Sequence, residues 1–416
     1  MSEFRFLHAA DLHLDSPLRG LEGHLSAPVE LIRGATRRAL EGMVALAIAE
    51  AVAFVLIAGD IYDGDWPDFG TGLFFAAQMR RLTDAGIAVF AIRGNHDAAN
   101  RMTRSLRMPH VTIFDHERAH TLPLLEALGV AIHGQSFAGQ AVPHDLSRAY
   151  PPPVEGLFNI GMLHTSAAGY AGHDSYAPCE LPRLKGHGYD YWALGHVHTR
   201  EILSEEPWVV FPGNLQGRHV GETGAKGASL VTVVNGRVRS VEHRTLDVLR
   251  WANIDVDLTG APDEFDALAR VQAGLETALR DAGPRSLAAR LTLSGVTNAH
   301  AALLGEGLRE KVQNEAQGLG GTHLLWLESI RLRTRPAHSA SRAERPDAMS
   351  RLLGEIETLA LAPDPGLLGD WPATLLGKLE GGLPPQHPLH ACAAGDLSRL
   401  METARERLEA LLAEPG

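Results

Sequence analysis

Five short polar motifs, each placed directly after an apolar run, constrain this chain more than any other feature of its sequence. The apolar runs predict strands at Phe4–Ala9, Phe54–Ala58, Ala88–Ile92, Ile160–Leu163 and Tyr191–Leu194. The motifs that follow them are Asp11-Leu12-His13, Gly59-Asp60-Ile61-Tyr62-Asp63, Gly94-Asn95-His96-Asp97, His164 and Gly195-His196-Val197-His198. Loops at the carboxyl ends of strands in an open α/β sheet converge on one crevice. We therefore expect the five motifs to form a single site.

The sequence between these motifs favours an α/β fold. Glu30–Ala51 and Thr71–Ala85 have helical character, so the first strands alternate with helices in a βαβ pattern. After His198 the pattern changes to strands joined by short turns, with Asn235-Gly236 as a hairpin signal. We therefore expect parallel strands early in the chain and antiparallel strands later.

Three regions are expected along the chain. Residues 1–246 would form the domain that carries the motifs. Strands and helices begin to alternate again at Trp251, which predicts a small α+β domain over residues 247–335. Its elements are expected at 251–258 (strand), 262–280 (helix), 289–294 (strand), 299–317 (helix) and 324–333 (strand). Residues 336–416 would form a linker and a helical C-terminal region.

The composition fits a globular protein of the cytoplasm. The net charge of −12 gives no general attraction to nucleic acid, so contact with DNA would need a local basic face. Cys179 and Cys392 are the only cysteines, which argues against disulfides and thiolate zinc sites and suits a reducing compartment. The N-terminus lacks a signal-peptide pattern, and the longest apolar stretch, Met43–Gly59, is interrupted by Glu50. No membrane location is expected.

The residue types in the five motifs are those of a two-metal hydrolytic site. Two cations roughly 3.5–4 Å apart can clamp a phosphate and lower the pKa of a bound water. Such a pair needs a bridging carboxylate and terminal oxygen and imidazole ligands. The candidate ligands are Asp11, His13, Asp60, Asn95, His164, His196 and His198. Because no thiolate is among them, manganese, iron and zinc all remain candidates. Each motif alone also fits an ordinary polar loop, and the combination indicates the metal site.

The combination resembles the calcineurin-like metallophosphoesterase superfamily. Within it, the chain is most similar to SbcD-like DNA repair exonucleases and their YhaO-type bacterial relatives. The phrases that carry this resemblance are residues 189–198 (YDYWALGHVH), Phe211-Pro212-Gly213-Asn214 and Glu222-x-Gly224-x-Lys226-Gly227. The resemblance implies a sandwich of mixed β-sheets flanked by helices, followed by a small α+β capping domain and a helical C-terminal region.

The resemblance also implies a role for each site residue. Asp11, His13 and His198 would bind one metal. Asn95, His164 and His196 would bind the other, with Asp60 bridging the two. His96 would be the catalytic histidine, oriented by Asp97, and Asp63 would support the site from behind the ligands. The metals would be two Mn²⁺ ions, with Fe²⁺ or Zn²⁺ as alternatives.

Candidate DNA contacts are basic residues near the motifs. Arg101, Arg104 and Arg107 are spaced by three without an acid between them, so on a helix they would share one side. A solvated helix face or a salt bridge between subunits would explain this spacing equally well. Arg218 and His219 follow Gly213-Asn214 and are further candidates.

The resemblance implies two protein partners. These are a second copy of the chain, giving a homodimer, and an SbcC-like ATPase of the SMC type with a coiled coil. An apolar stripe between Leu397 and Leu412 could dock a partner or could pack on its own domain.

Three functions follow from these patterns. The leading prediction is a manganese-dependent DNA exonuclease that acts in DNA repair, with additional endonuclease activity left open. The alternative is a metallophosphatase or phosphodiesterase acting on phosphoproteins or cyclic nucleotides, because the core motifs permit it. A non-catalytic scaffold for an ATPase is the third, although a scaffold needs none of the candidate ligands.

Overall fold

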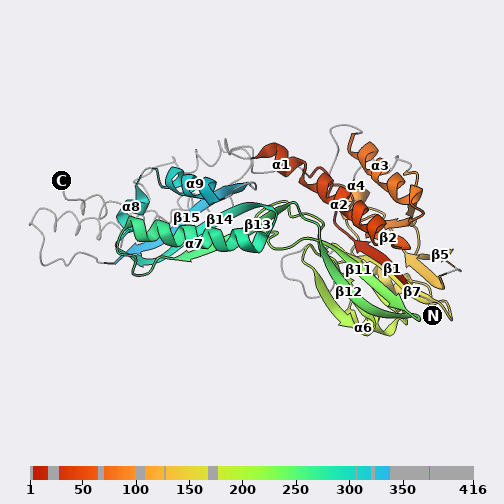
Figure 1. Cartoon of the computed structure of the whole chain (residues 1–416). Coiled ribbons are helices and arrows are strands. Elements are labelled where there is room, and N and C mark those ends of the chain that lie inside the picture. Colours follow the sequence, from red (N-terminus) through yellow and green to blue (C-terminus); the bar gives the residue numbers. More distant parts are fainter. Residues whose placement is uncertain are drawn as a thin grey trace, which may run out of the picture. The chain divides into compact units, whose positions relative to one another are not determined.

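The computed structural model describes residues 3–16, 28–63, 70–99, 108–125, 128–166, 177–305, 307–319, 324–337 and 374. Their contacts divide the chain into two units (Figure 1). The first comprises 1–253, 278–290 and 320–328, and the second comprises 254–277, 291–319 and 329–416. The predicted domain limits at 246 and 335 remain a prediction. The predicted linker and C-terminal helices lie almost entirely outside the described residues.

The first unit contains two six-stranded mixed sheets. In the first sheet the order is β12-β11-β1-β2-β3-β4, with β1 parallel to β2, β2 parallel to β3, and β11 antiparallel to β1 and β12. Its strands are β1 (Glu3–Ala9), β2 (Phe54–Ala58), β3 (Ala88–Ile92), β4 (Thr112–Ile113), β11 (Gly227–Val234) and β12 (Arg237–Thr245). The parallel strands come early in the chain and the hairpin late, as the sequence predicted.

The second sheet has the order β5-β6-β7-β8-β10-β9. The central strands β6, β7, β8 and β10 run parallel, and the edge strands β5 and β9 are antiparallel to their neighbours. The strands are β5 (His120–Leu125), β6 (Val130–Gly134), β7 (Phe158–His164), β8 (Tyr191–Gly195), β9 (Glu201–Glu205) and β10 (Trp208–Phe211).

Alternating side chains divide the core of this unit into layers, because successive residues of a strand point to opposite faces. Phe6, Phe54, Ile160 and Tyr191 belong to the cluster of buried residues that the two sheets share. Leu7, Val55 and Val89 face the other side of the first sheet, where α2 and α3 cover them (Figure 1). The helices of this unit are α1 (Val29–Arg33), α2 (Ala35–Ala49), α3 (Gly70–Asp84), α4 (Asn95–Ala99) and α6 (Leu181–Gly186), with a 3₁₀ turn η1 (Leu146–Ala149). The predicted sandwich of mixed sheets flanked by helices is confirmed.

A three-stranded sheet with the order β13-β14-β15 follows. Backbone bonds from Leu258 to Ser294 and from Gly260 to Val296 advance together along the chain, which is the parallel pattern. The elements are β13 (Leu249–Asp257), α7 (Glu264–Ala282), β14 (Ser286–Thr297), α8 (His300–Leu304), α9 (Leu308–Leu319) and β15 (Leu325–Pro336). The single helix predicted over 299–317 is wrong: Gly305 is extended, and Gly307 has a φ of 91°, which separates α8 from α9.

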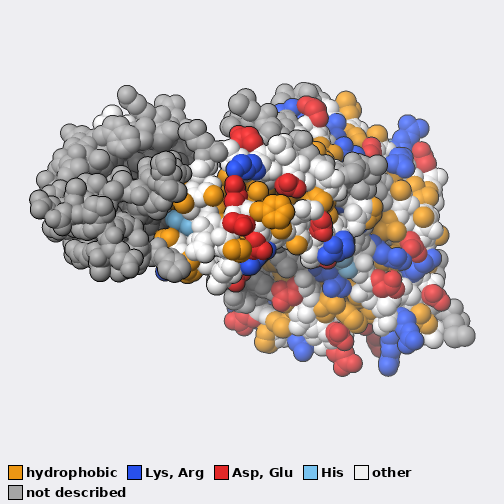
Figure 2. All heavy atoms as spheres, turned by 60° about the vertical axis from the view of Figure 1, so that its left-hand side comes forward, with side chains coloured by type: hydrophobic (Ala, Val, Ile, Leu, Met, Phe, Trp, Pro, Cys, Tyr) orange, Lys and Arg blue, Asp and Glu red, His pale blue; other side chains and the backbone are white. Residues whose placement is uncertain are grey.

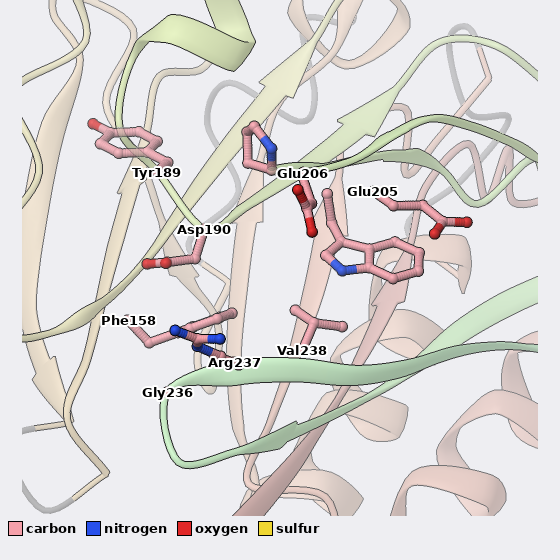
Figure 3. A pocket seen from close by; sticks show the side chains of 10 residues that line it. Phe158, Tyr189, Asp190, Glu205, Glu206, Gly236, Arg237 and Val238 are labelled. Carbon is pink, nitrogen blue, oxygen red and sulfur yellow. The ribbon is translucent and has the colours of Figure 1, made fainter.

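A cavity of about 330 Å³ opens where strands of the second sheet begin (Figure 3). Phe158, Asp190 and Trp208 line it at the starts of β7, β8 and β10, and Arg237 joins them from the β11–β12 turn. The predicted site residues His164 and His196 lie at the other ends of β7 and β8. The cavity is therefore separate from the predicted site.

Among the described residues, no helix has the length and apolar content needed to cross a membrane.

His8 ties the two sheets together from the interior. It is fully buried on β1, its Nδ1 lies 3.0 Å from the hydroxyl of Tyr191 on β8, and its Nε2 lies 3.1 Å from the carbonyl oxygen of Leu194. Burial lowers the pKa of His8 to about 3. The folded state therefore keeps the ring neutral at a pH where the unfolded chain would protonate it.

This difference predicts a specific loss of stability in acid. Because the folded pKa of His8 lies below the unfolded value of 6.5, its contribution is present above pH 6.5 and is lost as the pH falls toward 3. Between pH 7 and pH 5 the free energy of unfolding should fall by about 2 kcal/mol more in the wild type than in His8→Gln. Urea unfolding at the two pH values measures this, with His144→Gln, at an exposed position, as the control. Equal pH dependence in the wild type and His8→Gln would contradict the prediction.

Candidate metal centre

The five predicted motifs converge at the carboxyl ends of parallel strands in both sheets. Asp11 and His13 follow β1, Asp60 follows β2, and the Gly94–Asp97 motif follows β3 and enters α4. In the second sheet, His164 is the last residue of β7, and His196 and His198 follow β8. Adjacent strands β1, β2 and β3 are parallel, as are β7 and β8, so their ends emerge at one edge of each sheet.

Three overlapping groups of donor atoms form at this edge. The groups are Asp11/His13/His198, His13/Asp60/His96 and Asp60/His164/His196, and the donor atoms within each lie within 4.8 Å of one another. Asp60 belongs to two groups, as a carboxylate between two cations would. Asn95 joins them through its Oδ1, 3.0 Å from His164 Nε2. The structure thus brings all seven predicted ligands together.

Asp60 lies at the centre of the three groups and is 1% exposed. Its Oδ1 accepts a bond from the backbone N–H of His96 at 3.0 Å. Its Oδ2 lies 3.5 Å from His164 Nε2 and 3.8 Å from His13 Nε2. Burial acts to raise the pKa of Asp60, but His164 and His96 outweigh it and the pKa is lowered. The carboxylate is therefore held in the charged form that a metal ligand requires.

Asp11 is the second buried carboxylate of the group, also 1% exposed. The backbone N–H of His196 lies 3.1 and 3.0 Å from its two oxygens and donates to them, which joins the β1 loop to the β8 loop. Burial raises the pKa of Asp11 to about 6, against the opposing effect of His198 and His164. The raised pKa means that burial disfavours the ionised form of Asp11. A nearby positive charge would remove this cost, because an ionised carboxylate in a protein interior needs a counter-charge.

His164 is oriented by the chain itself. Its Nδ1 lies 2.9 Å from the carbonyl oxygen of Ala58, to which it can donate, and this leaves Nε2 directed at Asp60 and Asn95. Burial acts to lower the pKa of His164, but Asp60 outweighs it and raises the pKa to about 9. The shift shows how strongly positive charge is favoured beside Asp60. A divalent cation would displace this proton, since metal ligation requires the neutral ring.

Three glycines make room for the ring of His164. A Cβ atom at Gly59 would overlap it, one at Gly94 would lie 2.8 Å from its Nε2, and one at Gly195 would lie 2.9 Å from its Nδ1. Side chains essentially never pack that closely. Each of these glycines directly precedes a predicted ligand. Close packing against His164, together with Asp60 at Gly94 and the Ala58 carbonyl oxygen at Gly195, therefore explains the glycines of the Gly-Asp, Gly-Asn and Gly-His pairs.

The loops that carry the ligands adopt a costly backbone conformation. Asp11, His13, Asp60 and His196 have φ values of 52°, 42°, 52° and 101°. Positive φ is uncommon for residues other than glycine, and such strain occurs mostly at functional sites. His13 is fully buried, its Nε2 lies 3.1 Å from His198 Nε2, and burial lowers its pKa well below the ordinary value. The two facing nitrogens suit a shared cation.

The catalytic histidine predicted from the sequence is the most accessible member of the site. The side chain of His96 is 38% exposed, and its Nδ1 lies 2.9 Å from Asp63 Oδ1. That hydrogen bond raises the pKa of His96 above its ordinary value. The carboxylate that orients His96 here is Asp63, so the prediction that Asp97 would do so is corrected.

Asp97 has a different contact set. It is 1% exposed, and its carboxylate accepts bonds from the backbone N–H groups of Ile61, Tyr62 and Gly94 at 3.0–3.1 Å. Burial raises its pKa to about 7. Asp97 therefore pins the β2 loop to the β3 loop. In sequence it is adjacent to His96, but the helical turn of α4 directs the two side chains apart.

The predicted DNA contacts receive mixed support. Arg101, Arg104 and Arg107 lie outside the described residues. Arg218 is 17% exposed and paired with Asp63 and Glu222, while the side chain of His219 is 61% exposed. On the face shown in Figure 2, the described acidic and basic side chains are interspersed. The DNA-contact residues stay predictions.

Sequence reasoning missed the polar residues behind His198. Glu222 Oε1 lies 2.7 Å from His198 Nδ1, and Lys226 Nζ donates to the His198 carbonyl oxygen at 2.8 Å. Asn214 Nδ2 donates to Glu222 Oε2 at 2.9 Å. All three belong to phrases that carried the family resemblance, so a signal was present, but their role depends on contacts across the fold.

The chain is similar in sequence to known metallophosphoesterases. The family model "Calcineurin-like phosphoesterase" matches residues 4–200, and "Metallophosphoesterase YhaO, middle domain" matches residues 251–335. The "Uncharacterized metallophosphoesterase YhaO" of Bacillus subtilis is 38% identical over 300 residues, which cover 71% of this chain and 72% of that protein.

More distant relatives have a different name. The "DNA double-strand break repair protein Mre11" of Saccharolobus solfataricus is 26% identical over 172 residues, 39% of this chain and 43% of that protein. The Sulfurisphaera tokodaii protein of the same name is 21% identical, covering 64% of this chain and 69% of the relative.

These matches and the donor groups agree on the chemistry of the site. The imidazole and carboxylate donors fit a pair of divalent cations, and the metal's identity is open. The resemblance predicted from the motifs is confirmed at the level of the family. The chain belongs to the YhaO family of calcineurin-like metallophosphoesterases, with a two-metal site at the carboxyl ends of strands in its two six-stranded sheets.

Proposed function

We propose that this chain is a nuclease that hydrolyses phosphodiester bonds at DNA ends with two Mn²⁺ ions. The observation that carries the proposal is the place of Asp60, a buried carboxylate shared by two donor groups beside the half-exposed His96. Two divalent cations bound here would neutralise phosphate charge and promote attack by water. The donors include oxygen and imidazole, which suit Mn²⁺, Fe²⁺ or Zn²⁺.

His96 is the proposed proton donor. Asp63 engages its Nδ1, which leaves Nε2 as the ring atom able to protonate the leaving oxygen. The raised pKa of His96 favours the protonated ring that a general acid needs at neutral pH. Its backbone N–H is bonded to Asp60, so the acid is held at a set place relative to the metal ligands.

DNA is the proposed substrate because of the distant relatives. Several are named as DNA double-strand break repair proteins, and the two reported above match 39% and 64% of this chain. In an acidic chain, DNA binding would need local basic residues, for which Arg101, Arg104 and Arg107 remain candidates. A homodimer and an SMC-type ATPase partner also remain proposals.

Replacing His96 should separate hydrolysis from metal binding. The His96→Gln variant should cleave DNA about 10²–10⁴-fold more slowly, because the proton donor is lost, while it still binds two Mn²⁺. Asp60→Asn should lose both ions, because its carboxylate belongs to two of the three donor groups and lies between them. Single-turnover cleavage and elemental analysis measure the two effects. Normal cleavage by His96→Gln would end its assignment as the acid.

Gly94→Ala should disturb the metal centre through packing alone. Its Cβ would overlap Asp60 and lie 2.8 Å from His164 Nε2, and we expect a loss of about 1–3 kcal/mol in the free energy of unfolding, with reduced Mn²⁺ content. Gly42→Ala is the control. Gly42 lies within α2, and its Cβ would lie at an ordinary van der Waals distance of 3.7 Å from the Leu246 side chain. That variant should be up to about 1 kcal/mol more stable, with unchanged metal content. Similar metal content in both variants would contradict the packing argument.

A substrate panel tests the proposal as a whole. End-labelled duplex DNA, single-stranded DNA, a cyclic nucleotide and a nitrophenyl phosphate ester would be incubated with the chain and Mn²⁺. We expect mononucleotide release from duplex ends, and release about 10²–10⁴-fold slower from the His96→Gln variant. Turnover confined to the cyclic nucleotide or the nitrophenyl ester would favour the phosphatase alternative over a nuclease.

A further inference from the structure

One arginine joins the carboxylates that stand behind two of the site histidines. Arg218 Nη1 donates to Asp63 Oδ2 at 2.9 Å, and Nη2 donates to Glu222 Oε1 at 2.8 Å. Its Nε lies 3.2 Å from the same Glu222 oxygen. The side chain is 17% exposed. The guanidinium is therefore bonded on both sides to carboxylates of the site, and its Nη2 also lies 3.2 Å from His198 Nδ1.

Each of these carboxylates orients a different histidine. Glu222 Oε1 lies 2.7 Å from His198 Nδ1, which leaves His198 Nε2 facing His13. Asp63 Oδ1 lies 2.9 Å from His96 Nδ1. A carboxylate bonded to the outer nitrogen of a metal-binding histidine fixes its ring and raises its basicity. The same contact on His96 fixes the proposed acid.

The Glu222 carboxylate is itself held in place. Its Oε2 accepts bonds from Asn214 Nδ2 at 2.9 Å and from the Arg218 backbone N–H at 2.8 Å. Burial acts to raise the pKa of Glu222, but the hydrogen bond from His198 and the charge of Arg218 keep it far below its ordinary value. Glu222 is thus a fixed anion, and Arg218 supplies its counter-charge.

We propose that Arg218 is a positioning residue, which sets His96 relative to His198 through Asp63 and Glu222. The proposal rests on the proposed two-metal hydrolysis and assigns Arg218 a role other than the predicted DNA contact. Without the guanidinium, the two carboxylates lose their common cation, and each histidine is held only by its own partner. Arginine suits this place because its planar fork can bond two carboxylates at once, which a lysine ammonium matches poorly.

A manganese titration tests the link between Arg218 and His198. By calorimetry, the wild type should bind two Mn²⁺, and Arg218→Gln should bind one of them about 10- to 100-fold more weakly. Glu222→Gln should have the same effect, and the double variant should be no weaker than the weaker single variant, because both act on His198. Arg218→Lys should fold, since the charge is kept, but should recover only part of the affinity.

Arg244→Gln is the matched control. Arg244 Nη2 pairs with Glu50 at 2.8 Å, so this variant removes an arginine–glutamate pair of the same unit that makes no contact with the site residues described above. Its manganese affinities should equal those of the wild type. Unchanged affinities in Arg218→Gln, or fully additive losses in the double variant, would overturn the proposal.

Hydrolysis kinetics at saturating Mn²⁺ separate positioning from substrate contact. A positioning role predicts that Arg218→Gln lowers kcat on duplex DNA and leaves KM unchanged. A direct phosphate contact would instead raise KM, reduce the slope of binding against salt by about one, and leave the manganese titration unaltered. That result would overturn the proposal. If the wild type does not cleave DNA, the proposed function fails, while the titration still decides the role of Arg218.

Discussion

The burial of two carboxylates at the ends of neighbouring strands is the constraint on which this structure depends. Asp11 and Asp60 are each 1% exposed, and charged groups are seldom buried without partners. Backbone N–H groups of His196 and His96 donate to them, and imidazoles from both sheets surround them. Burial raises the pKa of Asp11, and the charge of Asp60 raises the pKa of His164. The site is therefore arranged for bound cations.

This arrangement places strict demands on the backbone. The β1 and β2 loops hold Asp11, His13 and Asp60 at positive φ, and glycines at positions 59, 94 and 195 leave no space for a Cβ beside the ring of His164. Each residue in a strained conformation costs on the order of 1–3 kcal/mol. The shared core of the two sheets offsets that cost, because it fixes the strand ends from which the loops emerge.

The site has two layers with different physical tasks. The inner layer contains the buried ligand candidates, and the outer layer contains carboxylates that hold histidine rings. Asp63 and Glu222 are the clearest members of the outer layer, and Arg218 joins them. Asp97 belongs to neither layer, because its carboxylate accepts bonds from backbone N–H groups and so joins two loops. The geometry thus separates residues that are adjacent in sequence.

Prediction from the sequence succeeded where local pattern decides structure. The run Phe54–Ala58 is entirely apolar, and it is a strand buried on both faces. The prediction failed where a short glycine-containing turn interrupts a periodic pattern, as at Gly305 and Gly307 between α8 and α9. The sequence predicted the alternating strands and helices of the small domain. That alternation alone did not determine the order β13-β14-β15 of the strands in its sheet.

The sequence by itself determined which side chains could bind metals, because each stands at the end of an apolar strand, and it indicated the family. Only the tertiary structure decided that Asp63 rather than Asp97 orients His96, and that Glu222 lies behind His198. The physical reason is that a hydrogen bond depends on the direction of a side chain. Direction is set by packing between loops whose contacting residues are 24 and 155 positions apart in the chain, as in the His198–Glu222 and Asp63–Arg218 contacts.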